Sequence, residues 1–100
     1  MRARRDKDAV ALLGRALLAH ARAADCQIAV VDGCGAPWAS ATFGGERVTV
    51  TLEGGSGLDS WVTSLPGADL QVRGYYIADL RVAGRTGSRA KLEGLLIEAA

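Results

Sequence analysis

The 100-residue sequence has few of the side chains from which metal sites and redox centres are built. It contains two cysteines, Cys26 and Cys34, one histidine, His20, and no Cys-x-x-Cys pair. One histidine and two cysteines fall short of the four protein ligands of a structural zinc site. We therefore expect no metal and no cofactor. Cys26 lies in an apolar run that is typical of a strand, which favours a buried thiol, but the spacing leaves the redox state of both cysteines open.

Long apolar runs are also missing, because none approaches the ~20 residues that a membrane span needs. The first 26 residues offer a basic start, an apolar stretch and an Ala-Arg-Ala triplet at residues 21–23, which together resemble a secretory signal. Asp6, Asp8 and Arg15 interrupt that pattern. We expect a cytoplasmic protein with no membrane partner. Asparagine is absent and Ala, Gly and Arg are abundant, a bias typical of a high-GC bacterial genome.

Recognisable catalytic motifs are absent from the sequence as well. There is no nucleophile elbow, zinc-binding helix, paired-carboxylate motif or phosphate-binding loop. An enzyme or a small-molecule-binding protein of unknown class therefore remains an alternative without an assigned catalytic residue. The polar side chains that such a site could use are His20, Cys26, Asp32, Cys34, Tyr75, Tyr76 and Asp79.

Net charge is small, at +1, so no overall field points to nucleic acid or to an anionic membrane. The charge is nevertheless uneven: residues 1–22 carry +4 and residues 73–91 carry +4. A nucleic-acid-binding protein is thus a second alternative, if the fold brings the basic N-terminus and the last hairpin together. The low number of aromatic residues in the chain and its pI near 7.8 argue against a nucleic-acid-binding function. The candidate contacts are Arg81, Arg85, Arg89 and Lys91.

The first periodic segment predicts a helix from Asp6 to Ala24, after a flexible basic N-terminus at residues 1–5. Apolar residues recur at helical spacing along one stripe. Leu12 and Leu18 flank that stripe, and this width predicts a second contact, which we interpret as a homodimer interface. Gly14 in the middle of the helix costs about 1 kcal/mol relative to Ala, so we expect close approach of the sheet backbone there.

The centre of the chain predicts a hairpin from Trp38 to Glu53, with Gly44-Gly45 as its two-residue turn. Its second arm alternates Val48, Val50 and Leu52 with polar residues, which gives one apolar face. The run from Cys26 to Val31 predicts a separate strand before this hairpin. The turn-forming stretch from Asp32 to Pro37 predicts the loop that joins them.

The second half predicts a two-turn helix from Leu58 to Leu65, with Ser56 and Asp59 as a capping box. Two strands should follow, from Asp69 to Arg73 and from Tyr75 to Ala83, the latter with Tyr76, Ala78, Leu80 and Val82 on one face. A loop from Gly84 to Gly87 leads to a last strand from Arg89 to Glu98. The tail Ala90–Ala100 also fits a helical period, so strand and helix both remain open there.

The predicted element order is α-β-β-β-α-β-β-β in a single domain, residues 1–100. We interpret it as an α+β two-layer sandwich, whose antiparallel sheet comes from two three-stranded units with both helices on one face. With a helical tail, the order resembles the fold of type III secretion chaperones, which implies dimers that bind extended segments of client proteins. The predicted core consists of Val10, Leu13, Leu17, Val48, Val50, Leu52, Leu58, Trp61, Val62, Leu65, Leu80 and Val82.

The leading functional hypothesis is a small non-catalytic protein-interaction module that self-associates and binds an unidentified protein partner. It rests on the wide apolar arc of the first helix, around Leu12 and Leu18. It also rests on the edge strands of the hairpins, which accept partner strands readily.

Overall fold

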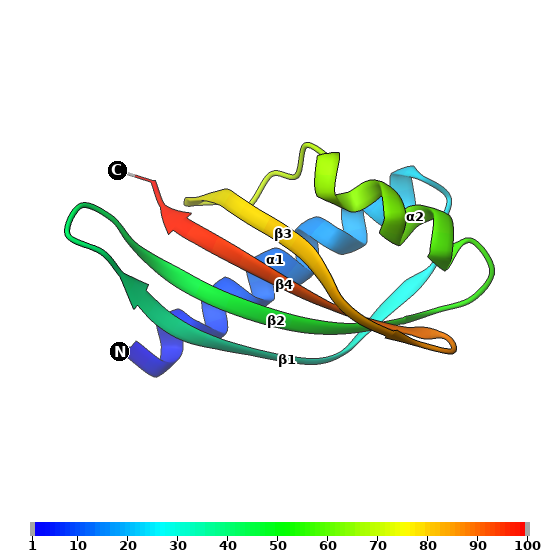
Figure 1. The fold of residues 1–100 in the computed structure, drawn as a ribbon, viewed down its shortest axis with the longest axis horizontal. Helices are drawn as coiled ribbons and strands as arrows, with labels where there is room; N and C mark the ends of the chain where they lie inside the picture. The colour runs from blue at the N-terminus through cyan, green and yellow to red at the C-terminus, as the bar shows by residue number, and fades with distance from the viewer. Residues whose placement is uncertain (1, 100) are drawn as a thin grey trace.

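Two helices and one four-stranded antiparallel sheet make up this α+β fold in a computed structural model, which describes residues 2–99 and side chains from residue 9 onward. The strands lie side by side in the order β1-β2-β4-β3 (Figure 1). The elements along the chain are α1 (Arg2–Ala23), β1 (Ile28–Ala39), β2 (Gly44–Gly54), α2 (Leu58–Ser64), the 3-10 turn η1 (Leu65–Gly67), β3 (Tyr75–Thr86) and β4 (Arg89–Glu98). Four strands therefore stand where the sequence predicted six in two three-stranded units.

The hairpin between β1 and β2 turns at Ser40–Phe43, so the predicted Gly44-Gly45 turn is wrong. Ser40 fixes the turn: its backbone N–H donates to the carbonyl oxygen of Phe43 (2.7 Å), and its Oγ accepts the backbone N–H of Phe43 (3.0 Å). Gly45 lies inside β2, where a Cβ atom would overlap the carbonyl oxygen of Leu96 in β4. The glycine is thus needed for close strand approach and not for positive φ.

β1 is one continuous strand, although the sequence predicted a strand, a loop and the start of the hairpin over these residues. The stretch from Asp32 to Pro37 pairs with β2 throughout, and the ladder is shifted only at Val31, which has no partner and forms a β-bulge. Gly33 lies under α1, because a Cβ there would come within 2.7 Å of Val10 Cγ1. Pro37 is tolerated because β1 is an edge strand.

A bulge at Ala78 reverses the side-chain pattern along β3, and this corrects the predicted face. Ile77 pairs with Leu96 and Asp79 with Leu95, so Ala78 is the extra residue. Before the bulge Ile77 faces the core, and after it Leu80 and Val82 do, whereas Tyr76 points outward and is 66% exposed. An inserted residue shifts the two-residue period by one, which alternation alone does not predict.

Of the two segments that flank β3 in the sequence, the first was predicted wrongly and the second correctly. Asp69–Arg73 forms no strand and contributes only an isolated bridge, between Val72 and Tyr75. β4 has the predicted bounds, Arg89–Glu98, and the helical alternative for the tail is excluded. The element order that resembles type III secretion chaperones needed that helix, so it is not realised in residues 2–99.

The core lies between α1 and one face of the sheet (Figure 1). Leu13 and Leu17 of α1 are fully buried in one cluster with Val48 and Val50 of β2 and Leu92 of β4. Of the twelve predicted core residues, Val10 and Val82 pack against this cluster and the other ten belong to it. Burial of these side chains supplies the dominant stabilising term of the fold.

Two local predictions about the helices are wrong. Gly14 is buried, but a Cβ there would meet only the side chain of Val30, at an ordinary 3.6 Å, so no sheet backbone requires a glycine. The N-cap of α2 is Gly57, with φ of 93° and no side-chain cap bond, so Ser56 and Asp59 form no capping box. Glycine at the cap accepts a conformation that serine avoids.

Candidate interaction surfaces

The face of the sheet that points away from α1 has no helical cover among the described residues. Figure 1 shows α1 behind the strands and no helix crossing in front of them. Because paired residues point to the same side of a sheet, the strand register assigns the side chains of this face. We call it the open face; it consists of Ala29, Asp32, Cys34, Ala36, Trp38, Arg47, Thr49, Thr51, Glu53, Tyr76, Asp79, Arg81, Thr86, Arg89, Lys91, Glu93, Leu95 and Ile97.

One end of the open face is apolar. Trp38, Gly45, Ile97 and Tyr76 are paired in one row across all four strands, and Leu95 lies in the next row. Gly45 adds no side chain between Trp38 and Ile97. We call Trp38, Tyr76, Leu95 and Ile97 the apolar patch; three of them are half-buried and Tyr76 is 66% exposed. A solvated sheet face is normally polar, so this end of the sheet is unusual.

A signal for this patch was present in the sequence. Leu95, Leu96 and Ile97 are consecutive apolar residues in a strand, and successive side chains point to opposite faces. Such a run places apolar side chains on both faces at once. The predicted core contains no residue of 89–98, so neither face of this strand was predicted from the sequence.

The other end of the open face is charged, and two ion pairs lie on it. Arg81 Nη2 lies 2.6 Å from Glu93 Oε1, and Arg89 Nε lies 3.4 Å from Glu53 Oε2. The hydrogen bond from Arg81 lowers the pKa of the Glu93 carboxyl, and the same bond raises the pKa of Arg81. These exposed pairs neutralise the hairpin locally.

The four candidate nucleic-acid contacts do not gather on one surface. Arg81, Arg89 and Lys91 lie on the open face, whereas Arg85 pairs with Asp59 of α2. The N-terminus and the β3–β4 turn lie at opposite ends of the molecule (Figure 1). The fold therefore does not join the two basic segments; the side chains of the basic residues in 1–8 lie outside the described part.

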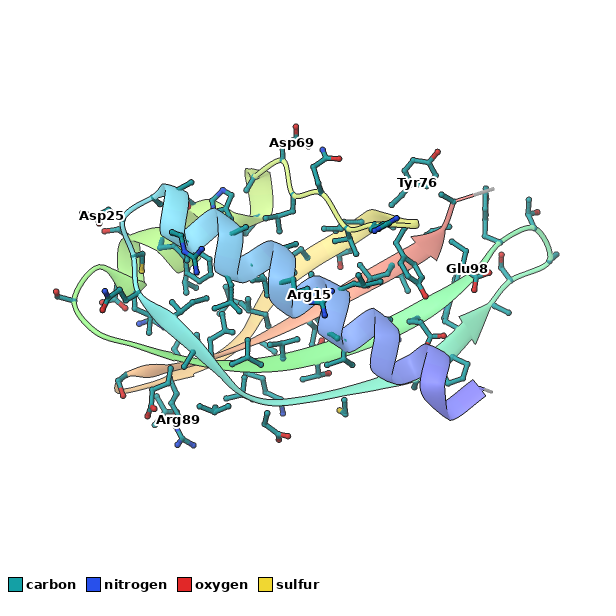
Figure 2. The ribbon with its side chains drawn as sticks, turned by 180° about the vertical axis from the view of Figure 1, so that it is seen from behind. Arg15, Asp25, Asp69, Tyr76, Arg89 and Glu98 are labelled. Atoms are coloured by element: carbon teal, nitrogen blue, oxygen red, sulfur yellow. The ribbon has the colours of Figure 1, made fainter. Side chains whose placement is uncertain are left out.

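Leu12 and Leu18, the candidate interface residues, have different surroundings on α1. Leu12 packs against the core, while Leu18 is 37% exposed. Leu18 also borders a shallow cavity of about 390 Å³ with Arg22, Asp25, Cys26, Gln27 and Ile28. In Figure 2, Arg15 lies on the side of α1 away from the sheet. No single apolar surface joins Leu12 to Leu18, so their role as one interface stays a prediction.

The candidate catalytic side chains are dispersed or already engaged. His20 Nδ1 accepts the indole N–H of Trp61 at 2.9 Å, and this bond ties α1 to α2. Cys26 is buried and Cys34 is exposed, and both are free thiols. Asp32 accepts the backbone N–H of Gly33. Among the described residues, no three His, Cys, Asp or Glu side chains converge as a metal site would require, and no helix is long and apolar enough to cross a membrane.

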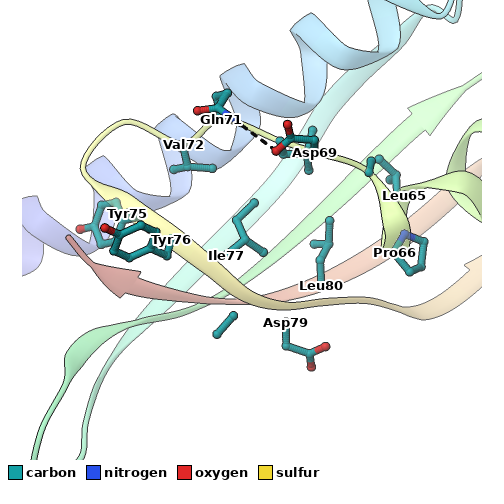
Figure 3. Close-up of a pocket in the computed structure, with 13 residues that line it drawn as sticks. Leu65, Pro66, Asp69, Gln71, Val72, Tyr75, Tyr76, Ile77, Asp79 and Leu80 are labelled. Carbon is teal, nitrogen blue, oxygen red and sulfur yellow. Dashed lines mark hydrogen bonds between the residues drawn. The ribbon is translucent and has the colours of Figure 1, made fainter.

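A second hollow surface follows the outer edge of β3 (Figure 3). This β3 groove has a volume of about 580 Å³, and its lining comes from residues 65–66, 68–72 and 75–80. Ile77 and Leu80 point toward the segment that carries Asp69 and Val72, and Asp79 points to the opposite side of the strand (Figure 3). The volume falls in the range of ligand-sized clefts. Three of the polar side chains that the sequence offered for a binding or catalytic site, Tyr75, Tyr76 and Asp79, line this groove.

Comparisons with protein-family models, with curated proteins and with solved structures found no match for this chain.

Proposed function

We propose that this chain is a small non-catalytic protein-interaction module of the bacterial cytoplasm, which forms a homodimer through the open face of its sheet. The observation that carries the proposal is the apolar patch on a sheet face that no helix covers. Association would remove Trp38, Tyr76, Leu95 and Ile97 from water, and burial of apolar surface is the main driving force of such interfaces.

The size of the open face supports a second copy as its cover. Viewed along its shortest axis, the Cα frame measures 42 × 22 Å. This outline encloses roughly 900 Å² (42 × 22 Å), and a standard interface buries ~800 Å² per partner. A copy stacked on the whole face would therefore reach the size range of stable complexes.

The charges of the open face also support self-association. Its charged side chains are four basic and four acidic, so the face as a whole is neutral: Arg47, Arg81, Arg89, Lys91, Asp32, Glu53, Asp79 and Glu93. Two identical faces meet in a twofold dimer, and a face with a large net charge would repel its copy. The same neutrality weakens the nucleic-acid alternative, which stays a prediction for Arg81, Arg85, Arg89 and Lys91.

The test compares Ile97→Arg on the open face with Leu18→Arg on α1. Both place a guanidinium on an apolar position at the surface, so they are matched in chemistry and differ in location. We expect Ile97→Arg to raise the dimer dissociation constant at least about tenfold, the effect of a central interface residue, and Leu18→Arg to leave it unchanged. Light scattering after size-exclusion chromatography gives the mass, and circular dichroism verifies folding.

Two results would overturn the proposal. One is a parent chain that stays monomeric at about 100 μM, well above the dissociation constant of a standard-size interface. The other is loss of the dimer in Leu18→Arg and not in Ile97→Arg, which would place the interface on α1.

A further inference from the structure

We infer that the β3 groove binds an extended polypeptide segment with basic side chains, which enters as an added strand between β3 and residues 68–72. This surface is separate from the open-face interface apart from Tyr76 and Asp79, which border both. The inference rests on the backbone of the two walls, on the apolar floor and on the charge of the lining.

The first wall is the free edge of β3, the last strand of the sheet. The backbone N–H of Ala99 donates to the carbonyl oxygen of Gly74 (2.9 Å), so Gly74 faces β4. In an antiparallel ladder the backbone groups of alternate residues face alternate sides. Ile77 therefore directs its N–H and C=O away from β4, and beyond the bulge Leu80, opposite Gly94, does the same.

The second wall is the extended segment from Ala68 to Val72. It is anchored at its ends, where Ala68 N–H donates to Leu65 O (2.9 Å) and Val72 O accepts Tyr75 N–H (3.0 Å). Between these anchors, Asp69, Leu70 and Gln71 make no backbone–backbone hydrogen bond within the described chain. The two walls thus resemble a hairpin that is closed at Val72–Tyr75 and splayed open beyond it.

An inserted strand would restore backbone pairing along both walls. The segment from Ala68 to Val72 has five residues, which corresponds to about 16 Å of extended chain at ~3.3 Å per residue. Backbone pairing to a free edge is a common mode of peptide recognition. Side chains on the inner side of the added strand would meet Ile77, Leu80 and Val72, which form the apolar floor (Figure 3).

The charge of the lining selects a basic occupant. Two charged side chains line the groove, and both are carboxylates, Asp69 and Asp79. Asp69 lies on the outer wall, where it accepts a bond from Gln71 Nε2 (3.4 Å), and Asp79 lies on β3. A lysine or arginine on the added strand would therefore find a carboxylate on either wall. Electrostatic complementarity of this kind sets partner choice more than affinity.

The other edge of the sheet in a second copy is a poor occupant. β1 carries Asp32 and no basic residue, so its charge matches that of the groove. Pro37 lacks an N–H, and the bulge at Val31 interrupts the strand. The occupant we commit to is therefore a segment of another protein, with apolar and basic side chains in alternation.

The test uses fluorescein-labelled, end-capped peptides with the sequence Val-Lys-Val-Lys-Val or Val-Glu-Val-Glu-Val. Fluorescence anisotropy at low salt measures binding to the full chain. We expect the lysine peptide to bind and the glutamate peptide to bind at least about fivefold more weakly, because each exposed charge pair contributes up to ~1 kcal/mol. N-methylation of alternate peptide nitrogens should weaken binding by about tenfold, because it removes backbone donors.

Matched variants locate the site on the chain. Asp69→Asn and Asp79→Asn keep shape and remove charge, and each should weaken the lysine peptide about two- to fivefold. Asp25→Asn removes a carboxylate outside the groove, at a positive-φ position (φ 60°) that asparagine tolerates, and should change nothing. Hydrogen exchange at the Ile77 and Leu80 amides should slow when the peptide is bound.

Every other outcome overturns the inference. These outcomes are no binding of the lysine peptide up to about 1 mM, equal binding of the two charge types, or equal binding after N-methylation. If Asp25→Asn and Asp69→Asn weaken binding of the lysine peptide equally, the peptide is attracted by the overall charge of the chain and not by a site in the β3 groove. Because the readout is peptide affinity, failure here is distinct from failure of the dimer, which is judged by mass.

Discussion

The two faces of the sheet use the same strands and have opposite surroundings. In β4, Leu92 and Leu96 point toward α1 and are fully buried, while Leu95 and Ile97 point to the open face and are half-buried. Strand alternation produces both sets with equal regularity. An apolar side chain in a strand therefore indicates a contact on its own face, whether that contact is made within the chain or with a partner.

The largest expected effect is the difference in stability lost when a leucine is truncated on the covered face and on the open face of β4. Leu92→Ala should lower the free energy of unfolding by about 2–5 kcal/mol, because it leaves a cavity under α1. Leu95→Ala, three residues away on the same strand, should cost less than about 1 kcal/mol in the monomer. Urea unfolding, at a protein concentration low enough to keep the chain monomeric, measures the loss of stability in both variants. Equal costs would show that the open face is as tightly packed as the covered one.

The next effect tests where the sheet is packed most closely. Gly45→Ala should destabilise the fold by about 1–3 kcal/mol, because its Cβ would overlap the Leu96 carbonyl oxygen and the strands would have to move. Thermal unfolding followed by circular dichroism measures the loss. An unchanged melting temperature would contradict the close approach of β2 and β4 at the row that carries the apolar patch.

Replacing Gly14, on the covered side of the sheet, should stabilise the fold and not destabilise it. Gly14→Ala should raise the free energy of unfolding by about 1 kcal/mol, because alanine favours the helix and its Cβ meets Val30 at an ordinary distance. The same thermal unfolding experiment serves as the measurement. Destabilisation would mean that α1 lies closer to β1 than the structure places it.

The smallest effect concerns the charged end of the open face. The Glu93 carboxyl should titrate below its ordinary value of 4.5, because Arg81 holds the charged form with a hydrogen bond. A lowered folded pKa gives a stabilising contribution that is present above 4.5 and is lost as pH falls through the folded value. Carboxyl NMR measures the titration, and Arg81→Gln should return it toward 4.5. A Glu93 pKa at or above 4.5 in the parent would contradict the pair.

The elements defined by an uninterrupted period could be predicted from the sequence. The stripe of α1 and the alternation of β2 follow from side-chain spacing, and burial confirms them. The predicted bounds of β4 are confirmed, but the spacing of its residues fits a helix as well as a strand. The failures have other causes. The Ser40 turn is held by local hydrogen bonds, but a serine is a weaker turn signal than the Gly44-Gly45 pair that follows it. The continuous β1 and the bulge at Ala78 depend on how strands and helix approach each other, and no local pattern records that.

The candidate surfaces were harder to predict for the same reason. Leu95 and Ile97 were visible as part of an apolar run, but their importance depends on the absence of a helix over that face. The β3 groove depends on a segment, Asp69–Val72, that has strand-like spacing and does not pair as a strand. Sequence patterns predict which side chains favour burial and which segments favour strand pairing. The tertiary arrangement decides which of them stay exposed or unpaired within the chain.

In the proposed dimer, two copies of the chain meet at the open face. Isotope-filtered NMR on a mixture of ¹³C-labelled and unlabelled chains detects only contacts between copies. We predict intermolecular contacts from the Ile97 and Leu95 methyl groups to the Trp38 or Tyr76 rings of the other copy. Intermolecular contacts confined to Leu18 and its neighbours on α1, or none at all at concentrations where the mass is that of a single 10.4 kDa chain, would contradict it.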